Sequence, residues 1–176
     1  MPQNPDPLKF RLSFIILPLA VMVIAAGIAG FFFGQLPAEI HYRFGLDGAP
    51  SGDPVSKNGF IGLMLAIQIG LTGLAYLSVR AIGRVQLFQD NVHNFWFNPT
   101  KLLTAMGNMP AIIQTVVAYI LIDGIFYALN DSHLMPLWLF TLITLVLGGI
   151  ILIIYALPVV LQTYRGFDSF QDKKKE

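Results

Sequence analysis

Among the side chains of this sequence, an acidic residue within an apolar stretch is the one best placed to do chemistry. Asp123 has Tyr119 and Tyr127 four residues to either side. Residues four apart share one face of an α-helix, so both phenol hydroxyls can donate hydrogen bonds to the carboxylate. An aspartate costs about 2.5–3.5 kcal/mol at the centre of a membrane helix and less near an edge, which makes it a functional candidate by default. We therefore predict an intramembrane polar site at Asp123, Tyr119 and Tyr127. The alternative is a structural carboxyl group that is protonated, or held by a neighbour such as Arg43.

The composition of the chain is that of a membrane protein. Of its 176 residues, 55% are hydrophobic and only 12% are charged, whereas a soluble domain has about 25% charged residues. The net charge is +1 and there is no cysteine. These values exclude a disordered chain, a nucleic-acid partner and thiolate chemistry. We expect an integral membrane protein for which membrane lipid is one partner.

Four long segments contain no Lys, Arg, Asp or Glu, and each exceeds the roughly 20 residues that cross a bilayer as a helix. Their apolar runs neither alternate as barrel strands do nor leave a polar helix face. The first run is also longer than the roughly 7–15 residues of a signal-peptide core, so we expect it to be retained. The sequence predicts an all-α membrane protein in one domain, 1–176, with four transmembrane helices at about 12–33, 60–80, 110–129 and 137–158.

Prolines and the distribution of positive charge refine this topology. Pro18 and Pro158 should bend their helices, and the third helix should start near Pro99 and bend at Pro110. Nine Lys and Arg residues flank the spans on the side of both termini, whereas only Arg43 and Lys57 lie on the other. Positive residues stay in the cytoplasm. We therefore expect a multi-pass protein of the cytoplasmic membrane, with both termini and a tail at 165–176 inside the cell.

Three further patterns concern packing. Gly30 and Gly34, like Ala66 and Gly70, have the small-x-x-x-small spacing of close helix contacts, for which packing within the chain is favoured over homo-oligomerisation. Gln68 and Gln114 are expected to form hydrogen bonds between helices. Apolar residues recur at helical spacing in 84–97, which predicts an amphipathic helix in the cytoplasmic interface; they are Val85, Phe88, Val92, Phe95 and Trp96.

The outer loop at 34–59 contains several glycines and prolines, which favour defined turns. We therefore expect this loop to be ordered. It resembles the motif of the bacterial and archaeal membrane domain-of-unknown-function family 1648, which also opens the immunity proteins of the Sdp toxin system. The family's second proline is His41 here, and its histidine is Arg43. The residues that carry the resemblance are Leu36, Pro37, Ile40, Phe44, Gly48, Pro50, Ser56 and Lys57.

This resemblance implies a non-enzymatic, sensor- or immunity-like protein that recognises a peptide or an envelope signal through its first outer loop. The expected binding residues are Leu36, Pro37, His41, Arg43, Phe44, Gly48, Pro50 and Lys57. No metal-ligand spacing, phosphate-binding loop or nucleophile motif is present, so no catalytic residue, metal or cofactor is expected. An accessory or homo-oligomeric subunit of a larger membrane complex is the second hypothesis, and a transporter using Asp123 is the third.

Overall fold

The computed structural model describes residues 10–42, 44–45, 51–84 and 99–172, with the backbone alone at Pro99, 155–156 and 158–172. Most of the described chain is helical, which confirms the predicted helical class. In chain order the elements are η1 Leu12–Phe14, α1 Ile16–Phe32, β1 Glu39–Ile40, β2 Val55–Ser56, α2 Lys57–Ile82, α4 Pro99–Asn108, α5 Pro110–Asn130 and α6 Leu137–Asp172.

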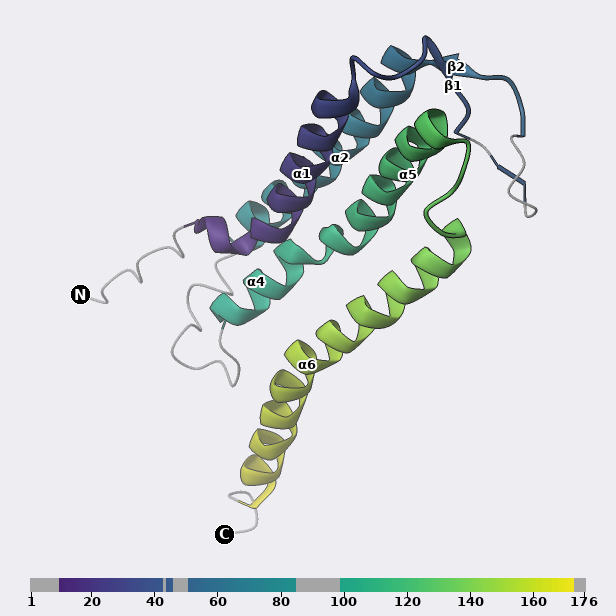
Figure 1. The fold of residues 1–176 in the computed structure, drawn as a ribbon. Helices are drawn as coiled ribbons and strands as arrows, with labels where there is room; N and C mark the ends of the chain where they lie inside the picture. Colours follow the sequence, from purple (N-terminus) through teal and green to yellow (C-terminus); the bar gives the residue numbers. More distant parts are fainter. Residues whose placement is uncertain (1–9, 43, 46–50, 85–98, 173–176) are drawn as a thin grey trace.

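The helices run alternately up and down, so that α1 starts and α6 ends at the same end of the molecule (Figure 1). At the other end, β1 and β2 form a two-stranded antiparallel pair in which Glu39 faces Ser56 and Ile40 faces Val55. The turn between α5 and α6, residues 131–136, lies at this end as well (Figure 1). We call the end that contains β1, β2 and this turn the strand end.

Three helical segments are long and apolar enough to cross a membrane: Lys57–Ile82, Thr100–Asn130 and Leu137–Ile154. A shorter apolar helix, Ile16–Phe32, completes the set. Its 17 residues span about 26 Å at 1.5 Å per residue, slightly less than the roughly 30 Å of a hydrocarbon core. The described chain therefore has the form of a helical membrane protein.

The first helix starts later than the sequence predicts, whereas the third span starts where it is predicted to start. The first was predicted from residue 12, but a 3₁₀ turn precedes α1, which begins at Ile16. Pro18 is then in the first helical turn, where an N–H has no intrahelical partner, so the proline removes no hydrogen bond from α1. The third span does start at Pro99 and break before Pro110, as predicted.

The last helix is longer than predicted. It continues past Pro158 to Asp172, so that most of the tail expected at 165–176 is helical. The interfacial helix expected at 84–97 falls almost entirely outside the described residues, as do the last four residues of the tail. Figure 1 shows α6 leaning away from the other helices toward its C-terminal end.

Two apolar clusters hold the bundle together. The cluster nearer the strand end joins α1, α2 and α5 to the loop through residues such as Ala29, Ile40, Phe60 and Leu121. The other lies where η1 meets α2 and α4, and contains Phe14, Ile15, Ala75, Val79 and Leu103. The strand end is therefore anchored to the helices by a continuous core.

The small residues that pack are not those predicted. A side chain added at Gly30 or Gly34 would have no atom within 4 Å, and Ala66 and Gly70 are exposed. The prediction that these four pack within the chain is therefore wrong. Close approach occurs instead at glycines of the later helices, such as Gly124, where an added Cβ would lie 2.7 Å from Cζ of Phe60.

The predicted role of the two membrane glutamines is confirmed. Nε2 of Gln68 donates to the backbone carbonyl of Gln114 at 2.9 Å, and Nε2 of Gln114 donates to the carbonyl of Gln68 at 2.9 Å. Gln114 also donates to the Thr72 hydroxyl at 2.9 Å. Both glutamines are 0% exposed, so the bonds join α2 and α5 in an apolar interior.

Candidate functional site

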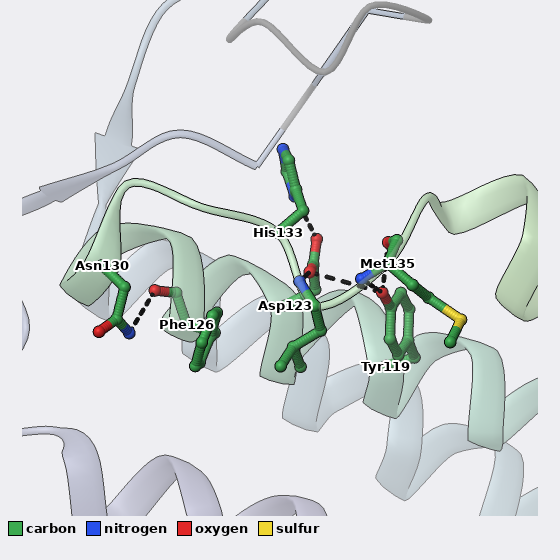
Figure 2. Close-up of polar contacts among 7 residues, drawn as sticks. Tyr119, Asp123, Phe126, Asn130, His133 and Met135 are labelled. Atoms are coloured by element: carbon green, nitrogen blue, oxygen red, sulfur yellow. Dashed lines mark hydrogen bonds and ion pairs between the residues drawn. The ribbon is translucent and has the colours of Figure 1, made fainter.

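The carboxyl group of Asp123 is buried and is held by the turn that follows its own helix. Nδ1 of His133 lies 2.7 Å from Oδ2 of Asp123, and the backbone N–H of Leu134 donates to Oδ1 at 2.9 Å. The ring nitrogen and the carboxyl oxygen share one proton in this contact. Asp123 is 6% exposed, and Figure 2 shows its side chain pointing from α5 toward this turn.

Tyr119 extends the same network by one helical turn. Its hydroxyl lies 3.5 Å from Oδ1 of Asp123, accepts from the backbone N–H of Met135 at 3.0 Å and donates to the Met135 carbonyl. The ring stacks on Phe140 of α6, with the centroids 3.8 Å apart. Three successive residues of the turn are thus bonded to α5 (Figure 2), which fixes the α5–α6 hairpin.

Tyr127 faces the same cluster through its ring. It stacks on His133 with centroids 4.7 Å apart, and Phe44 of the first loop meets both rings edge-on, at 4.7 Å from Tyr127 and 4.3 Å from His133. Phe44 and His133 are 89 positions apart in the sequence. The two sites predicted separately, the intramembrane polar site and the first outer loop, therefore form one cluster.

Local sequence explains why the turn folds back on α5. Asp131 ends the helix with a left-handed backbone (φ 53°), and its N–H donates to the carbonyl of Tyr127 at 2.8 Å. Aspartate is one of the few residues that tolerates this conformation. Pro136 then precedes α6, and its carbonyl accepts from the N–H groups of Leu139 and Phe140 in the first turn of that helix. The connection between Asp131 and Pro136 brings His133 to Asp123.

Two residues of the family-like motif hold helix ends. The hydroxyl of Ser56 accepts from the N–H of Gly59 at 3.2 Å, which caps the start of α2. The ammonium group of Lys57 donates to the carbonyls of Phe33 and Leu36, at 3.4 and 3.3 Å, and lies 4.9 Å from the centre of the Phe33 ring. A cation at this place stabilises the C-terminal end of α1, whose carbonyls lack partners.

The other motif residues divide into buried and exposed groups. Leu36 and Ile40 belong to the core, whereas Pro37 is exposed. His41 is half-buried, and its Nδ1 is buried with no hydrogen-bond partner. Three of the predicted binding residues lie outside the described part of the chain, namely Arg43, Gly48 and Pro50.

His133 is the site residue that sequence reasoning did not connect to Asp123. Arg43 was the partner considered, but it lies outside the described residues. One feature of the sequence could have identified this contact. A histidine lies in the six-residue connection 131–136, only ten residues after Asp123. The alternative in which a neighbouring loop holds Asp123 for structure is realised in these contacts.

Both oxygens of Asp123 are engaged by the turn, Oδ2 by His133 and Oδ1 by the N–H of Leu134. In the described ranges, no three His, Cys, Asp or Glu residues stand close enough to hold a metal ion. Comparison with known proteins finds no match to this chain among protein-family models, curated proteins or solved structures.

Proposed function

We propose that the chain crosses the cytoplasmic membrane four times, with the strand end outside and both termini in the cytoplasm. The apolar helices and their alternating directions support four crossings, with α4 and α5 together forming the third. The nine-to-two distribution of Lys and Arg favours this orientation. Membrane lipid then surrounds the helices.

We further propose that the protein is a non-enzymatic receptor-like protein that recognises a peptide or an envelope signal at the strand end. The observation that carries this proposal is the contact of Phe44 with Tyr127 and His133. A loop that only connected two helices would not need to pack against the α5–α6 turn. The resemblance of 34–59 to the immunity proteins of the Sdp toxin system supports the same function.

The charges of the strand end favour a basic ligand. Glu39, Asp53 and Asp131 are exposed there, whereas the ammonium group of Lys57 is directed to carbonyls at the end of α1. Exposed carboxylates attract a cationic partner and raise its rate of encounter. A lysine- or arginine-containing peptide with an apolar side would also match the aromatic cluster beneath them.

Peptide binding to the full chain in lipid nanodiscs tests this proposal. A lysine-rich amphipathic probe peptide should bind more tightly than its glutamate-rich counterpart. The triple variant Glu39→Gln, Asp53→Asn, Asp131→Asn should weaken that binding by roughly tenfold, or about 1.4 kcal/mol. The matched control neutralises three acids of the C-terminal segment of the sequence, Asp168, Asp172 and Glu176, and should bind as the unaltered protein does. Equal loss in both variants, or no binding by either peptide, would refute recognition at the strand end.

A second function, as an accessory or homo-oligomeric subunit, is favoured by one specific observation. Gly27 and Gly30 of α1, and Gly34 just after its end, are exposed, and a Cβ added at any of them meets no atom within 4 Å. Such exposed glycines permit close approach by another membrane helix. Gly30→Leu should then convert an oligomer into a monomer in light scattering of the purified protein, whereas Gly73→Leu should not. A monomeric unaltered protein would exclude the homo-oligomer.

A further inference from the structure

An apolar cavity of about 450 Å³ lies between α6 and the rest of the bundle. Its walls come from α1, from α4 and α5, and from the cavity-facing side of α6, with residues such as Val21, Ile112, Leu147 and Ile151. Leu147 and Ile151 are 56% and 51% exposed. The cavity is therefore reached from the side of the bundle, where the helices face lipid.

Three of the four polar side chains in its walls, those of Thr104, Asn108 and Thr115, are bonded to the protein itself. The hydroxyls of Thr104 and Thr115 donate to the carbonyls four residues earlier, at 2.8 and 2.7 Å. Asn108 accepts from the N–H of Leu17 at 2.9 Å and donates to the carbonyls of Ser13 and Thr104. An occupant with polar groups would find these partners already engaged, so the cavity favours hydrocarbon.

The cavity is elongated along the helices. Its walls run along the third span from Thr104 to Thr115, which is roughly 16 Å at 1.5 Å per residue. An extended hydrocarbon chain that lies parallel to the helices matches both this length and the apolar lining.

A positive charge stands at the end of the cavity that is nearer the start of α4. Lys101 is exposed and precedes Thr104, Ala105 and Asn108 by three, four and seven residues. This spacing places Lys101 on the cavity-facing side of α4, one turn beyond the cavity wall. A lysine at this level can reach the headgroup region of the membrane and attract a phosphate.

We propose that this cavity binds one acyl chain of a phospholipid, whose phosphate lies beside Lys101. The apolar walls, the engaged polar groups and the elongated shape select the chain, and Lys101 selects an anionic headgroup. Lipid bound in this way fills the space between α6 and the other helices. This site is separate from the strand end and does not depend on the function proposed for it.

Two neighbouring isoleucines provide the test. Ile151 lines the cavity and Ile150 does not, although their exposed fractions are 51% and 49%. The full chain is reconstituted in vesicles of equal phosphatidylglycerol and phosphatidylcholine, extracted gently, and its retained phospholipids are counted by native mass spectrometry. The unaltered protein and Ile150→Trp should each retain one phospholipid per chain. Ile151→Trp should lower this occupancy by about tenfold, because the indole fills the cavity.

A second pair of variants tests the same site in case Ile151→Trp does not fold. Thr144 lines the cavity and Thr141 does not, so Thr144→Phe should lose the lipid and Thr141→Phe should keep it. Lys101→Gln should keep one lipid but remove the preference for phosphatidylglycerol over phosphatidylcholine. Retention of lipid by both cavity-filling variants, or no retained lipid in the unaltered protein, would overturn the site. An unchanged headgroup preference in Lys101→Gln would overturn the part assigned to Lys101.

Discussion

At the scale of single residues, the hydrogen bonds of Asp123 determine what its substitution does. Asp123→Leu would leave the N–H of Leu134 and Nδ1 of His133 without their acceptor in a part-buried place. An unsatisfied buried donor costs about 1–3 kcal/mol, and more when charge is involved. We expect a loss of about 2–4 kcal/mol in the free energy of unfolding, measured by denaturant titration in detergent micelles.

The conservative variant separates hydrogen bonding from charge. Asp123→Asn keeps one carbonyl oxygen as an acceptor for Leu134 or His133, so it should lose less than half as much stability as Asp123→Leu. Equal losses in both variants would show that charge is what matters at this position. No loss in either would contradict a role for the network in fixing the α5–α6 turn.

The sequence identifies part of this site because of local spacing alone. Tyr119 and Asp123 share a helix face in any α-helix, so their pairing follows from a separation of four residues. The contact with His133 depends on the left-handed residue Asp131 and on where the turn places each following side chain. The contact with Phe44 joins two loops far apart in the sequence. Neither is encoded in a spacing, and so neither could be predicted from one sequence.

At the scale of elements, Gly124 sets how closely α5 approaches α2. A Cβ at this position would lie 2.7 Å from Cζ and 3.2 Å from Cε1 of Phe60, whose ring is buried in the core. Gly124→Ala should therefore lower the free energy of unfolding by about 1–3 kcal/mol, the usual cost of overpacking. The measurement is thermal unfolding followed by circular dichroism in detergent.

Gly73→Ala is the matched control for this prediction, because an added Cβ there meets nothing within 4 Å. In a helix interior, alanine is favoured over glycine by roughly 1 kcal/mol, so this variant should be neutral or more stable. A double variant with Phe60→Leu should recover part of the loss in Gly124→Ala. Equal behaviour of the two glycine variants would contradict the close contact.

The junction between α1 and α4 depends on one asparagine. Asn108 accepts from the N–H of Leu17 in the first turn of α1 and donates to the carbonyl of Ser13. It thereby satisfies a helix-start N–H that has no partner within its own helix. Asn108→Ala should cost about 1–2 kcal/mol. Asn130→Ala, which removes one bond at an exposed helix end, should change the unfolding midpoint much less; an equal effect would contradict the capping role.

Element boundaries show where sequence patterns suffice and where they fail. Pro110 marks a helix start because its ring fits the first helical position, and this could be predicted. The start of α1 at Ile16 could not, because it is set by Asn108, 92 residues later along the chain. The glycines that pack are selected by which helix lies opposite, and Gly30 and Gly34 have the right spacing without a neighbour. Spacing alone does not identify the partner.

At the scale of the whole molecule, the two proposed sites lie at different depths of one bundle. The strand end joins the first loop and the α5–α6 turn through Phe44 and His133, and the cavity lies farther along, between α6 and the facing sides of α1, α4 and α5. In the described residues, hydrogen bonds tie the turn before α6 to α5, and apolar side chains line the cavity along the middle of α6. Substitutions in the cavity should therefore change the position of α6 while leaving peptide binding at the strand end intact.

The orientation of this bundle decides which site faces which compartment, and the absence of cysteine makes it directly measurable. Asp53 and Arg84 are both exposed and lie at opposite ends of the molecule. A membrane-impermeant maleimide added to intact spheroplasts should label Asp53→Cys, because the proposed orientation puts the strand end outside. It should label Arg84→Cys only after the membrane is permeabilised. The reverse pattern would invert the orientation derived from the positive charges and place the acidic strand end in the cytoplasm. Labelling of both sites in intact cells would contradict the odd number of membrane crossings that α2 makes between them.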